Sequence, residues 1–213
     1  MKHLKVTIIL LSALTWQTAQ AQDIFPDSIE VGDNPLGFET LQKEKNVEHT
    51  IFANYMPGWI TSKVYTPHGN HSWQGGQGYE VGYRCLFHGG YGFSLSYSHS
   101  ETTFPYGYEL GLNFAGASFI YGGHFAPQWI FTSEIGLGYA NYTDAGSKMK
   151  DGFGTRYALG MEYMLGSAIG IGLGLSYQAS TFSKDKNNGY YDSDKYVNGF
   201  NRLSVNVGLR LYL

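Results

Sequence analysis

One short string in this sequence carries the residue types of a hydrolytic site. Ser98, His99, Ser100 and Glu101 follow one another directly, and serine, histidine and carboxylate are the groups of nucleophilic acyl transfer. In a β-strand, however, alternation sends His99 and Glu101 to one face and the two serines to the other. The histidine then has no serine on its own side. We therefore predict a hydrated histidine near a strand end, and no catalytic residue.

Other side chains that could bind a metal have unsuitable spacing. His68 and His71 are three residues apart, which suits a metal on a helix, but the proline and glycine that flank His68 oppose a helix there. The repeated glycines lack the strand, turn and helix of a nucleotide-binding loop. Three aspartates could suggest a calcium site, but their spacing lacks the ordered ligands of a calcium loop; they are Asp185, Asp192 and Asp194. We predict neither a metal site nor a cofactor.

The largest set of charged residues follows the small or polar side of alternating segments. All four arginines share that side with four glutamates, whereas all ten lysines lie outside these segments. Opposite charges can neutralise one another in a narrow lumen, while an arginine facing lipid would cost about 2–4 kcal/mol near the bilayer centre. The predicted lumen charge network comprises Glu80, Arg84, Glu109, Glu134, Arg156, Glu162, Arg202 and Arg210.

Alternating segments of this kind fill the chain after about residue 47. Large apolar residues alternate with small or polar ones, and an apolar-Gly-apolar triplet recurs, as in Ile135-Gly136-Leu137. This pattern is typical of half-buried β-strands. The predicted strands are 48-60, 77-87, 91-104, 108-121, 128-142, 153-164, 168-182 and 200-213.

The connections between these strands alternate in length. Those after strands two, four and six are tight, whereas 61-76, 143-152 and 183-199 are long and polar. Short periplasmic turns with longer external loops, and an even strand count, are typical of outer-membrane barrels. The connection at Pro105-Tyr106-Gly107 is the exception, because it is short and should be external.

Two ways of rolling up the sheet are open. In a soluble, lipocalin-like binder the apolar face would line the interior and the charges would face water. In a membrane barrel the bulky face touches lipid, and glycine and serine suit the tightly filled interior of eight strands. The crowded aromatic side favours the second arrangement, with Tyr and Trp forming interfacial girdles. We predict an all-β fold, an eight-stranded antiparallel transmembrane up-and-down β-barrel.

The N-terminus carries the features of an export signal. Lys2 and Lys5 precede an apolar run, and Ala19-Gln20-Ala21 fits a signal-peptidase site. The predicted domains are a signal peptide at 1-21, an acidic periplasmic tail at 22-46 and an outer-membrane barrel at 47-213. The net charge of −3 and the absence of a basic stripe give no indication of nucleic-acid binding.

The last strand ends in a recognisable pattern. A polar residue is followed by glycine and then by outward apolar residues at Asn206, Gly208, Leu211 and Leu213, which resembles the assembly signal of outer-membrane barrels, with leucine in place of the usual terminal aromatic. With the strand pattern, the chain after residue 47 resembles the OmpA/OmpX-type eight-stranded barrels. The resemblance implies periplasmic chaperones and the barrel-assembly machinery as partners, and membrane lipids and lipopolysaccharide as neighbours.

Two functional hypotheses follow from these observations. The favoured one is a non-enzymatic outer-membrane barrel with an envelope-structural or surface-interaction role. The alternative is a lipid A-modifying barrel enzyme, since some eight-stranded barrels place serine, histidine and carboxylate near the outer rim. A general diffusion porin is disfavoured, because eight strands leave a lumen filled by side chains.

Overall fold

The computed structural model describes residues 47–66, 69–144, 150–182 and 199–213. The predicted signal peptide at 1-21 and tail at 22-46 lie outside the described residues, as do His68 and nearly all of the long connection 183-199. Within the described ranges, no helix has the length and apolar character needed to cross a membrane.

The chain is built from successive β-strands, with a single 3-10 turn, η1 (Pro105–Gly107), among the described residues. The strands are β1 (Val47–Tyr55), β2 (Gly58–Ile60), β3 (Val64–Thr66), β4 (Gly69–His71), β5 (Gln74–Phe87), β6 (Tyr91–Phe104), β7 (Tyr108–Ala126), β8 (Trp129–Asp144), β9 (Lys150–Met164), β10 (Ile169–Phe182) and β11 (Gly199–Tyr212).

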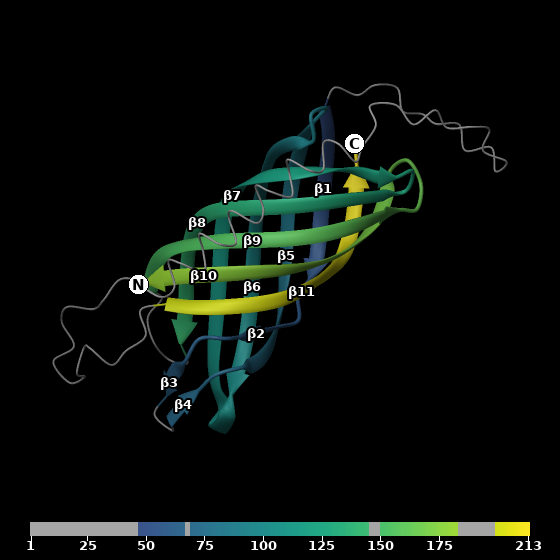
Figure 1. Ribbon diagram of the computed structural model, residues 1–213. Coiled ribbons are helices and arrows are strands. Elements are labelled where there is room, and N and C mark those ends of the chain that lie inside the picture. The colour runs from purple at the N-terminus through teal and green to yellow at the C-terminus, as the bar shows by residue number, and fades with distance from the viewer. Residues whose placement is uncertain (1–46, 67–68, 145–149, 183–198) are drawn as a thin grey trace. The chain divides into compact units, whose positions relative to one another are not determined.

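The sheet closes on itself into a barrel (Figure 1). Each long strand pairs antiparallel with its neighbours in sequence, and β1 and β2 together pair with β5 on one side and with β11 on the other. Because β1 and β2 occupy one position in the ring, the barrel has eight positions. The predicted fold, an eight-stranded antiparallel up-and-down barrel of the transmembrane type, is confirmed.

The predicted first strand, 48-60, is divided by Pro57. Proline has no backbone N–H for a ladder hydrogen bond, so pairing is interrupted there. The pairing register is nevertheless kept, because Tyr55 faces Val207 before the break and Ile60 faces Arg202 after it. The predicted long connection 61-76 contains two short strands, β3 and β4, which pair with each other.

The residue register fixes the tilt of the strands. Stepping from Thr50 through the paired residue on each successive strand leads once around the ring to Ile60, ten residues further along the first strand. This displacement is the shear of the barrel, and with eight strands it requires a tilt of about 35–45°. The tilt brings side chains from distant strands to one level of the lumen.

The two ends of the barrel differ, as the loop lengths predicted. At the short-turn end the connections are 88–90, 127–128 and 165–168, and the N–H of Leu213 donates to the carbonyl of His49 at 2.9 Å. The loop end carries the β3–β4 hairpin and the turn η1. In η1, Tyr106 and Gly107 both have positive φ values, 66° and 76°, which lets three residues reverse the chain. The short connection predicted at Pro105–Gly107, at the end that otherwise carries the long loops, is therefore present.

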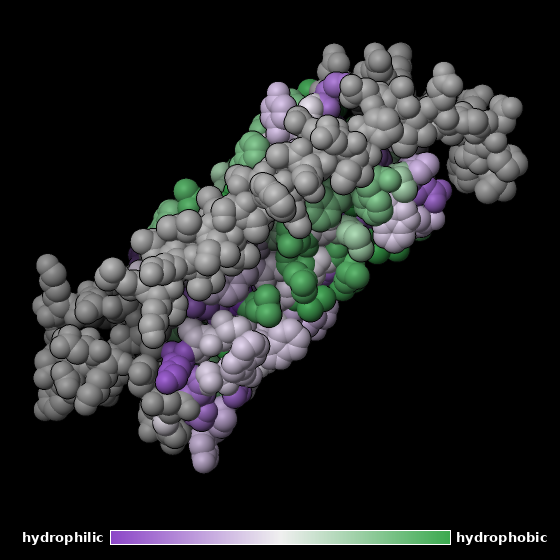
Figure 2. Space-filling view, viewed as in Figure 1, coloured by the Kyte–Doolittle hydropathy of each residue, from purple (hydrophilic) through white to green (hydrophobic). Residues whose placement is uncertain are grey.

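The outer wall of the barrel is apolar and aromatic. Aliphatic residues such as Leu137, Leu173 and Leu209 are exposed in mid-strand, and Figure 2 shows apolar residues along the middle of the coloured part of this face. Aromatic residues are exposed toward both ends, namely Phe87, Tyr91 and Trp129 at the short-turn end and Tyr55, Trp59 and Tyr139 toward the loop end. This arrangement matches an apolar band between two aromatic girdles.

The interior contains two layers of different chemistry. Toward the short-turn end most inward side chains are charged or polar, with Phe52, Ile120 and Ile130 packed among them. Toward the loop end the inward side chains form an apolar cluster, a departure from the small and polar interior that was predicted, consisting of Ile60, Val64, Phe104, Leu110, Leu112, Phe114, Ala140, Phe182 and Phe200. Several members stand at the ends of their strands, so the cluster fills the lumen at the loop end of the barrel.

Candidate functional site

The charged layer of the lumen is built from arginines that cross between strands. Arg84 on β5 reaches β8 and β9, with Nη2 2.9 Å from Glu134 Oε1 and Nη1 2.7 Å from Glu162 Oε1. Both glutamates are almost fully buried. A guanidinium presents several N–H donors in one plane, so a single arginine can bind two carboxylates.

Two further arginines extend this network around the lumen. Arg156 on β9 binds Glu80 Oε1 at 2.6 Å and Glu134 Oε2 at 2.8 Å. Arg210 on β11 donates from Nε to Glu162 Oε1 at 2.6 Å. Each glutamate in this network thus contacts at least one arginine, which compensates the cost of burying its charge.

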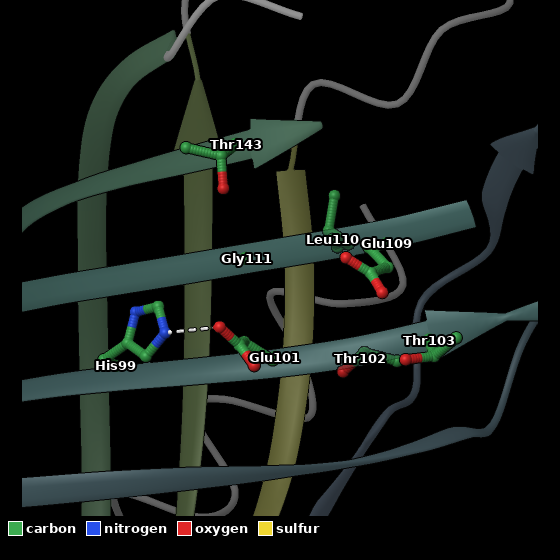
Figure 3. Close-up of a pocket in the computed structure, with 8 residues that line it drawn as sticks. All are labelled: His99, Glu101, Thr102, Thr103, Glu109, Leu110, Gly111 and Thr143. Atoms are coloured by element: carbon green, nitrogen blue, oxygen red, sulfur yellow. Dashed lines mark hydrogen bonds and ion pairs between the residues drawn. The ribbon is translucent and has the colours of Figure 1, made fainter. Parts of the chain in front are cut away.

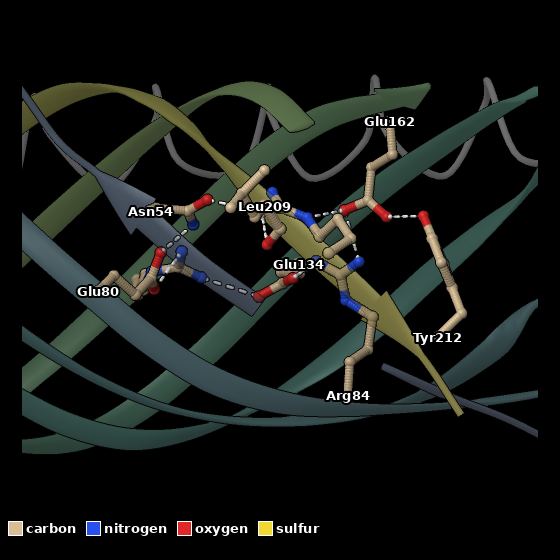
Figure 4. A network of polar contacts seen from close by, with 9 residues as sticks. Asn54, Glu80, Arg84, Glu134, Glu162, Leu209 and Tyr212 are labelled. Atoms are coloured by element: carbon tan, nitrogen blue, oxygen red, sulfur yellow. Dashed lines mark hydrogen bonds and ion pairs between the residues drawn. The ribbon is translucent and has the colours of Figure 1, made fainter. Parts of the chain in front are cut away.

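Neutral side chains saturate the remaining oxygens (Figure 4). Asn54 donates to Glu80 Oε2 at 2.8 Å and accepts from Arg210 Nη1 at 2.7 Å. The hydroxyl of Tyr212 donates to Glu162 Oε2 at 2.9 Å. Carboxylates held in this way are occupied as acceptors, so the network is suited to structural closure of the lumen and not to general-base chemistry.

An aromatic ring completes the layer. The guanidinium carbons of Arg84 and Arg210 lie 5.2 and 5.5 Å from the centre of the Phe52 ring. Stacking of this kind adds a cation–π attraction that is larger in a desolvated site. The sequence reasoning did not assign Asn54, Phe52 or Tyr212 to the network. Strand alternation could have indicated this, because Tyr212 lies two residues from Arg210 and so shares its inward face.

One predicted member of the network lies elsewhere. Glu109 was expected in the lumen, but it is exposed on the outer side of β7. The even-numbered residues of β7 face inward, and Leu110, Leu112 and Phe114 are each at most 3% exposed. The prediction is wrong because bulky residues were assigned to the outside throughout, whereas here they fill the lumen.

Arg202 is inward and buried as predicted, but it stands apart from the other three arginines. Its Nε donates to Ser204 Oγ at 3.1 Å, Nη1 to Thr102 Oγ1 at 3.2 Å and Nη2 to the Met56 carbonyl at 3.1 Å. All three acceptors are neutral. Arg202 therefore belongs to the lumen but not to the ion-pair network.

The outer face carries a second polar arrangement near the loop end, here called the rim ladder. It crosses β6, β7, β8 and β9 and comprises Tyr97, His99, Glu101, Asn113, Tyr139, Asn141 and Asp151. His99 Nδ1 lies 2.7 Å from Asn113 Oδ1, and Nε2 lies 3.2 Å from Glu101 Oε1. Asn113 donates to Asn141 at 2.8 Å. Both ring nitrogens of His99 thus face oxygen acceptors.

A shallow hollow of about 170 Å³ adjoins the rim ladder (Figure 3). Its floor is Gly111, and a Cβ there would lie 2.5 Å from Thr143 Oγ1 and 4.0 Å from His99 Cε1. Glu101 and Glu109 supply carboxylates at its edge. The hollow therefore exists because glycine occupies an outward position between larger polar neighbours.

The hollow does not unite the groups of a serine hydrolase. Ser98 and Ser100 are buried on the lumen side, and Ser100 Oγ donates to the Leu112 carbonyl at 3.4 Å. His99 is on the outer side with Glu101. The alternation argument therefore placed these residues correctly. In the part of the chain that the structure describes, no group of three or more histidine, cysteine or carboxylate side chains could hold a metal ion.

The residues of the predicted assembly signal lie along the last strand. Asn206 faces the lumen and accepts from Ser176 Oγ at 3.0 Å. Leu211 and Leu213 face outward at the short-turn end, and Gly208 lies against the backbone of β1. The apolar residues of the pattern are thus on the outer wall.

Comparison with known proteins identifies the fold. No family model matches the sequence, and no curated protein matches it. Among solved structures, Neisserial surface protein A (NspA) is 14% identical, with a TM-score of 0.56, and covers 78% of this chain and 96% of its own. OprG from Pseudomonas aeruginosa is 12% identical (TM-score 0.49, covering 78% and 95%), and Ail from Yersinia pestis is 13% identical (0.47, 78% and 98%). The likeness to NspA shows that this chain has the fold of a small outer-membrane β-barrel, as the sequence resemblance predicted.

Proposed function

We propose that this chain is a non-enzymatic integral protein of the outer membrane, with an envelope-structural or surface-contact role. The observation that carries the proposal is the inversion of polarity across the wall. Arginines and glutamates are paired in the interior, while leucine, valine and aromatic side chains cover the exterior. A wall of this kind is stable in a bilayer and unfavourable in water, where so large a contiguous apolar surface is not tolerated in a soluble monomer.

The interior opposes the soluble, lipocalin-like alternative. A soluble binder of small apolar ligands needs an apolar cavity, whereas most of this lumen is occupied by ion pairs and hydroxyl groups. The apolar cluster at the loop end is packed from several strands and belongs to the core of the barrel. An arginine facing lipid costs about 2–4 kcal/mol near the bilayer centre. This cost explains why the arginines of a membrane barrel face inward.

Orientation follows from the two ends. We expect the short-turn end to face the periplasm and the loop end to face outside. The aromatic girdle at the loop end and the rim ladder would then lie at the level of the outer-leaflet headgroups. Lipopolysaccharide and other membrane lipids would then be the immediate neighbours of the wall. Periplasmic chaperones and the barrel-assembly machinery would act during biogenesis, after removal of the signal peptide, with Leu211 and Leu213 accessible on the outer wall.

The test combines folding and orientation. The membrane-extracted protein should migrate differently on gels before and after boiling, and protease added to intact cells should cleave within 61-76 or 183-199 but not at 88–90. A matched pair of variants with one protease site at Gly69 or at Gly89 separates the two ends. Solubility of the folded mature protein without detergent would contradict the proposal, and so would cleavage at Gly89 alone.

The enzyme alternative is supported by one observation, the hollow that brings His99 and Glu101 beside two threonine hydroxyls, those of Thr103 and Thr143. Its test is the lipid A profile, measured by mass spectrometry in cells that express the wild type or His99→Ala. On our proposal the two profiles are identical and equal to that of cells without the protein. A lipid A species present only with the wild type would favour the enzyme.

A further inference from the structure

The charges inside the barrel do not balance. Among the described residues, four arginines are buried in the lumen, but only three glutamates, namely Glu80, Glu134 and Glu162, are buried with them. Glu109, the fourth glutamate predicted for the lumen, is exposed on the outer wall. Among the fully buried groups of the described residues there is therefore one arginine more than there are carboxylates.

The surplus cation is Arg202. The other three arginines each contact a glutamate, at 2.6 to 2.9 Å. The three groups that accept hydrogen bonds from Arg202 are two hydroxyls and a carbonyl. Only 2% of the residue is exposed, so bulk water does not compensate its charge. A guanidinium stays protonated under all ordinary conditions, so it cannot relieve this cost by losing its proton.

The surroundings of Arg202 suit a small anion. Ile60 is its register partner on β2, and Phe200 and Phe104 lie two residues nearer the loop end than Arg202 and Thr102 on the same strands. The apolar cluster therefore covers the site toward the loop end. On the side of the short-turn end, β6 presents hydroxyls to the lumen at every second position, at Ser94, Ser96, Ser98, Ser100 and Thr102. At the far end of this row from Thr102, the hydroxyls of Ser94 and Ser96 are buried and have no hydrogen-bond partner among the described residues.

The hydroxyls around Arg202 can serve both the cation and a ligand. Thr102 and Ser204 accept hydrogen bonds from the guanidinium through their oxygen atoms. Each therefore keeps its own O–H, which can be donated to a second acceptor. An anion placed there would receive hydrogen bonds from hydroxyls and face a full positive charge, a combination of charge-assisted contacts that is strong in a low-dielectric interior.

We propose that Arg202, together with Thr102 and Ser204, binds a small monovalent inorganic anion of the chloride type inside the lumen. One positive charge is available, so a monovalent ion neutralises the site, whereas a divalent phosphate would reverse its charge. The hydroxyl row on β6 extends from the site toward the short-turn end, while the apolar cluster closes the loop end. The bound anion would stabilise the folded barrel, because it binds the folded state alone.

The first test is the anion dependence of stability. The refolded protein in a nonionic detergent is unfolded with urea in sodium chloride or in sodium gluconate at the same ionic strength. The wild type should unfold at a higher urea concentration in chloride, and Arg202→Met should unfold at the same concentration in both salts. Arg202→Lys, which keeps the charge, and Thr132→Val, which removes a buried hydroxyl in the charged layer, should both retain the difference.

A second test locates the ion directly. Crystals grown in sodium bromide should give an anomalous peak beside the Arg202 guanidinium, within hydrogen-bonding distance of Thr102 and Ser204. If Arg202→Met does not fold, the double variant Thr102→Val/Ser204→Ala supplies the comparison and should reduce the chloride effect. The proposal is overturned if the wild type has the same midpoint in both salts, if a folded Arg202→Met keeps the full chloride effect, or if no bromide binds at this position.

Discussion

Glu162 is the most connected carboxylate of the lumen, and its neutralisation is the sharpest test of the network. Its Oε1 binds Arg84 at 2.7 Å and Arg210 at 2.6 Å, and its Oε2 accepts from Tyr212 at 2.9 Å. Glu162→Gln keeps the shape of the side chain but removes its charge. Arg84 retains Glu134, whereas Arg210 keeps only neutral partners among the described residues.

Glu162→Gln should lower the free energy of unfolding substantially, although it changes the side chain at one heavy atom. Breaking a buried ion pair by neutralising one partner costs about 3–5 kcal/mol, because the other charge remains buried. The matched control is Glu101→Gln on the outer rim, where the side chain is 68% exposed and pairs with part-exposed His99. An exposed pair contributes about 0–1 kcal/mol, so the control should be close to the wild type.

The assay is equilibrium unfolding by urea in detergent or lipid vesicles, followed by tryptophan fluorescence. A double-variant cycle then separates pairing from packing: Glu162→Gln/Arg210→Gln should lose less stability than the sum of the two single variants, because the second change removes the charge that the first leaves unpaired. An exposed ion pair contributes up to about 1 kcal/mol. If the unfolding free energies of Glu162→Gln and Glu101→Gln differ by no more than this, the lumen network does not stabilise the barrel and our reasoning about it is wrong.

Three further predictions use the same unfolding assay. Leu173→Arg, in the middle of the outer wall, should lower the free energy of unfolding in vesicles by about 2–4 kcal/mol, and Thr181→Arg near the loop end by about 0–1 kcal/mol. Equal losses would argue against a lipid-facing wall. Phe114→Ala should lose about 3–5 kcal/mol by opening a cavity in the apolar cluster, and a negligible loss would mean that the cluster is not packed. Gly208→Ala should lose about 1–3 kcal/mol by crowding β1, whereas Gly166→Ala, whose added Cβ meets nothing within 4 Å, should behave like the wild type.

Alternation in the sequence was sufficient to predict the eight strand positions and most of the inside-outside pattern. It succeeded because every residue of a barrel strand faces either the wall or the lumen, so a period of two is imposed along each strand. Leu209 and Arg210 on β11 illustrate this, since the first is 62% exposed and the second is 6% exposed. The short connections were also predictable, because two to four residues suffice for an antiparallel turn. The one after β7 is shorter than predicted, since β7 continues to Ala126.

The identity of the ion pairs could not be predicted in the same way. Arg84 on β5 contacts Glu162 on β9, and this contact depends on the strand tilt, which follows from the register of all the pairs around the ring. No local pattern in the sequence specifies that register. The sequence therefore indicated which charges face the lumen, with Glu109 as the error, but not which carboxylate each arginine binds.

The error at Glu109 has an identifiable cause. In the triplet Leu110-Gly111-Leu112 the glycine faces outward and the leucines inward, whereas the glycines of the triplets around Gly82, Gly136 and Gly208 lie on the inward-facing side of their strands. The repeat alone suggested one orientation for all copies. The reversal places Gly111 at the floor of the rim hollow and puts two leucines in the apolar cluster, so this single inversion affects both features.

The inward glycines also explain how a lumen of this shear can be filled by large side chains. Gly82 is the register partner of Phe52, and a Cβ there would collide with the Phe52 ring. On the other side of the barrel, a Cβ at Gly116 or Gly138 would lie 2.6 or 2.8 Å from the Phe114 ring. Glycine on one strand thus provides the space that an aromatic ring from the same or a neighbouring strand occupies, as close packing requires. The glycine-rich repeat is therefore the complement of the large inward residues, and the two must be varied together in any redesign of the lumen.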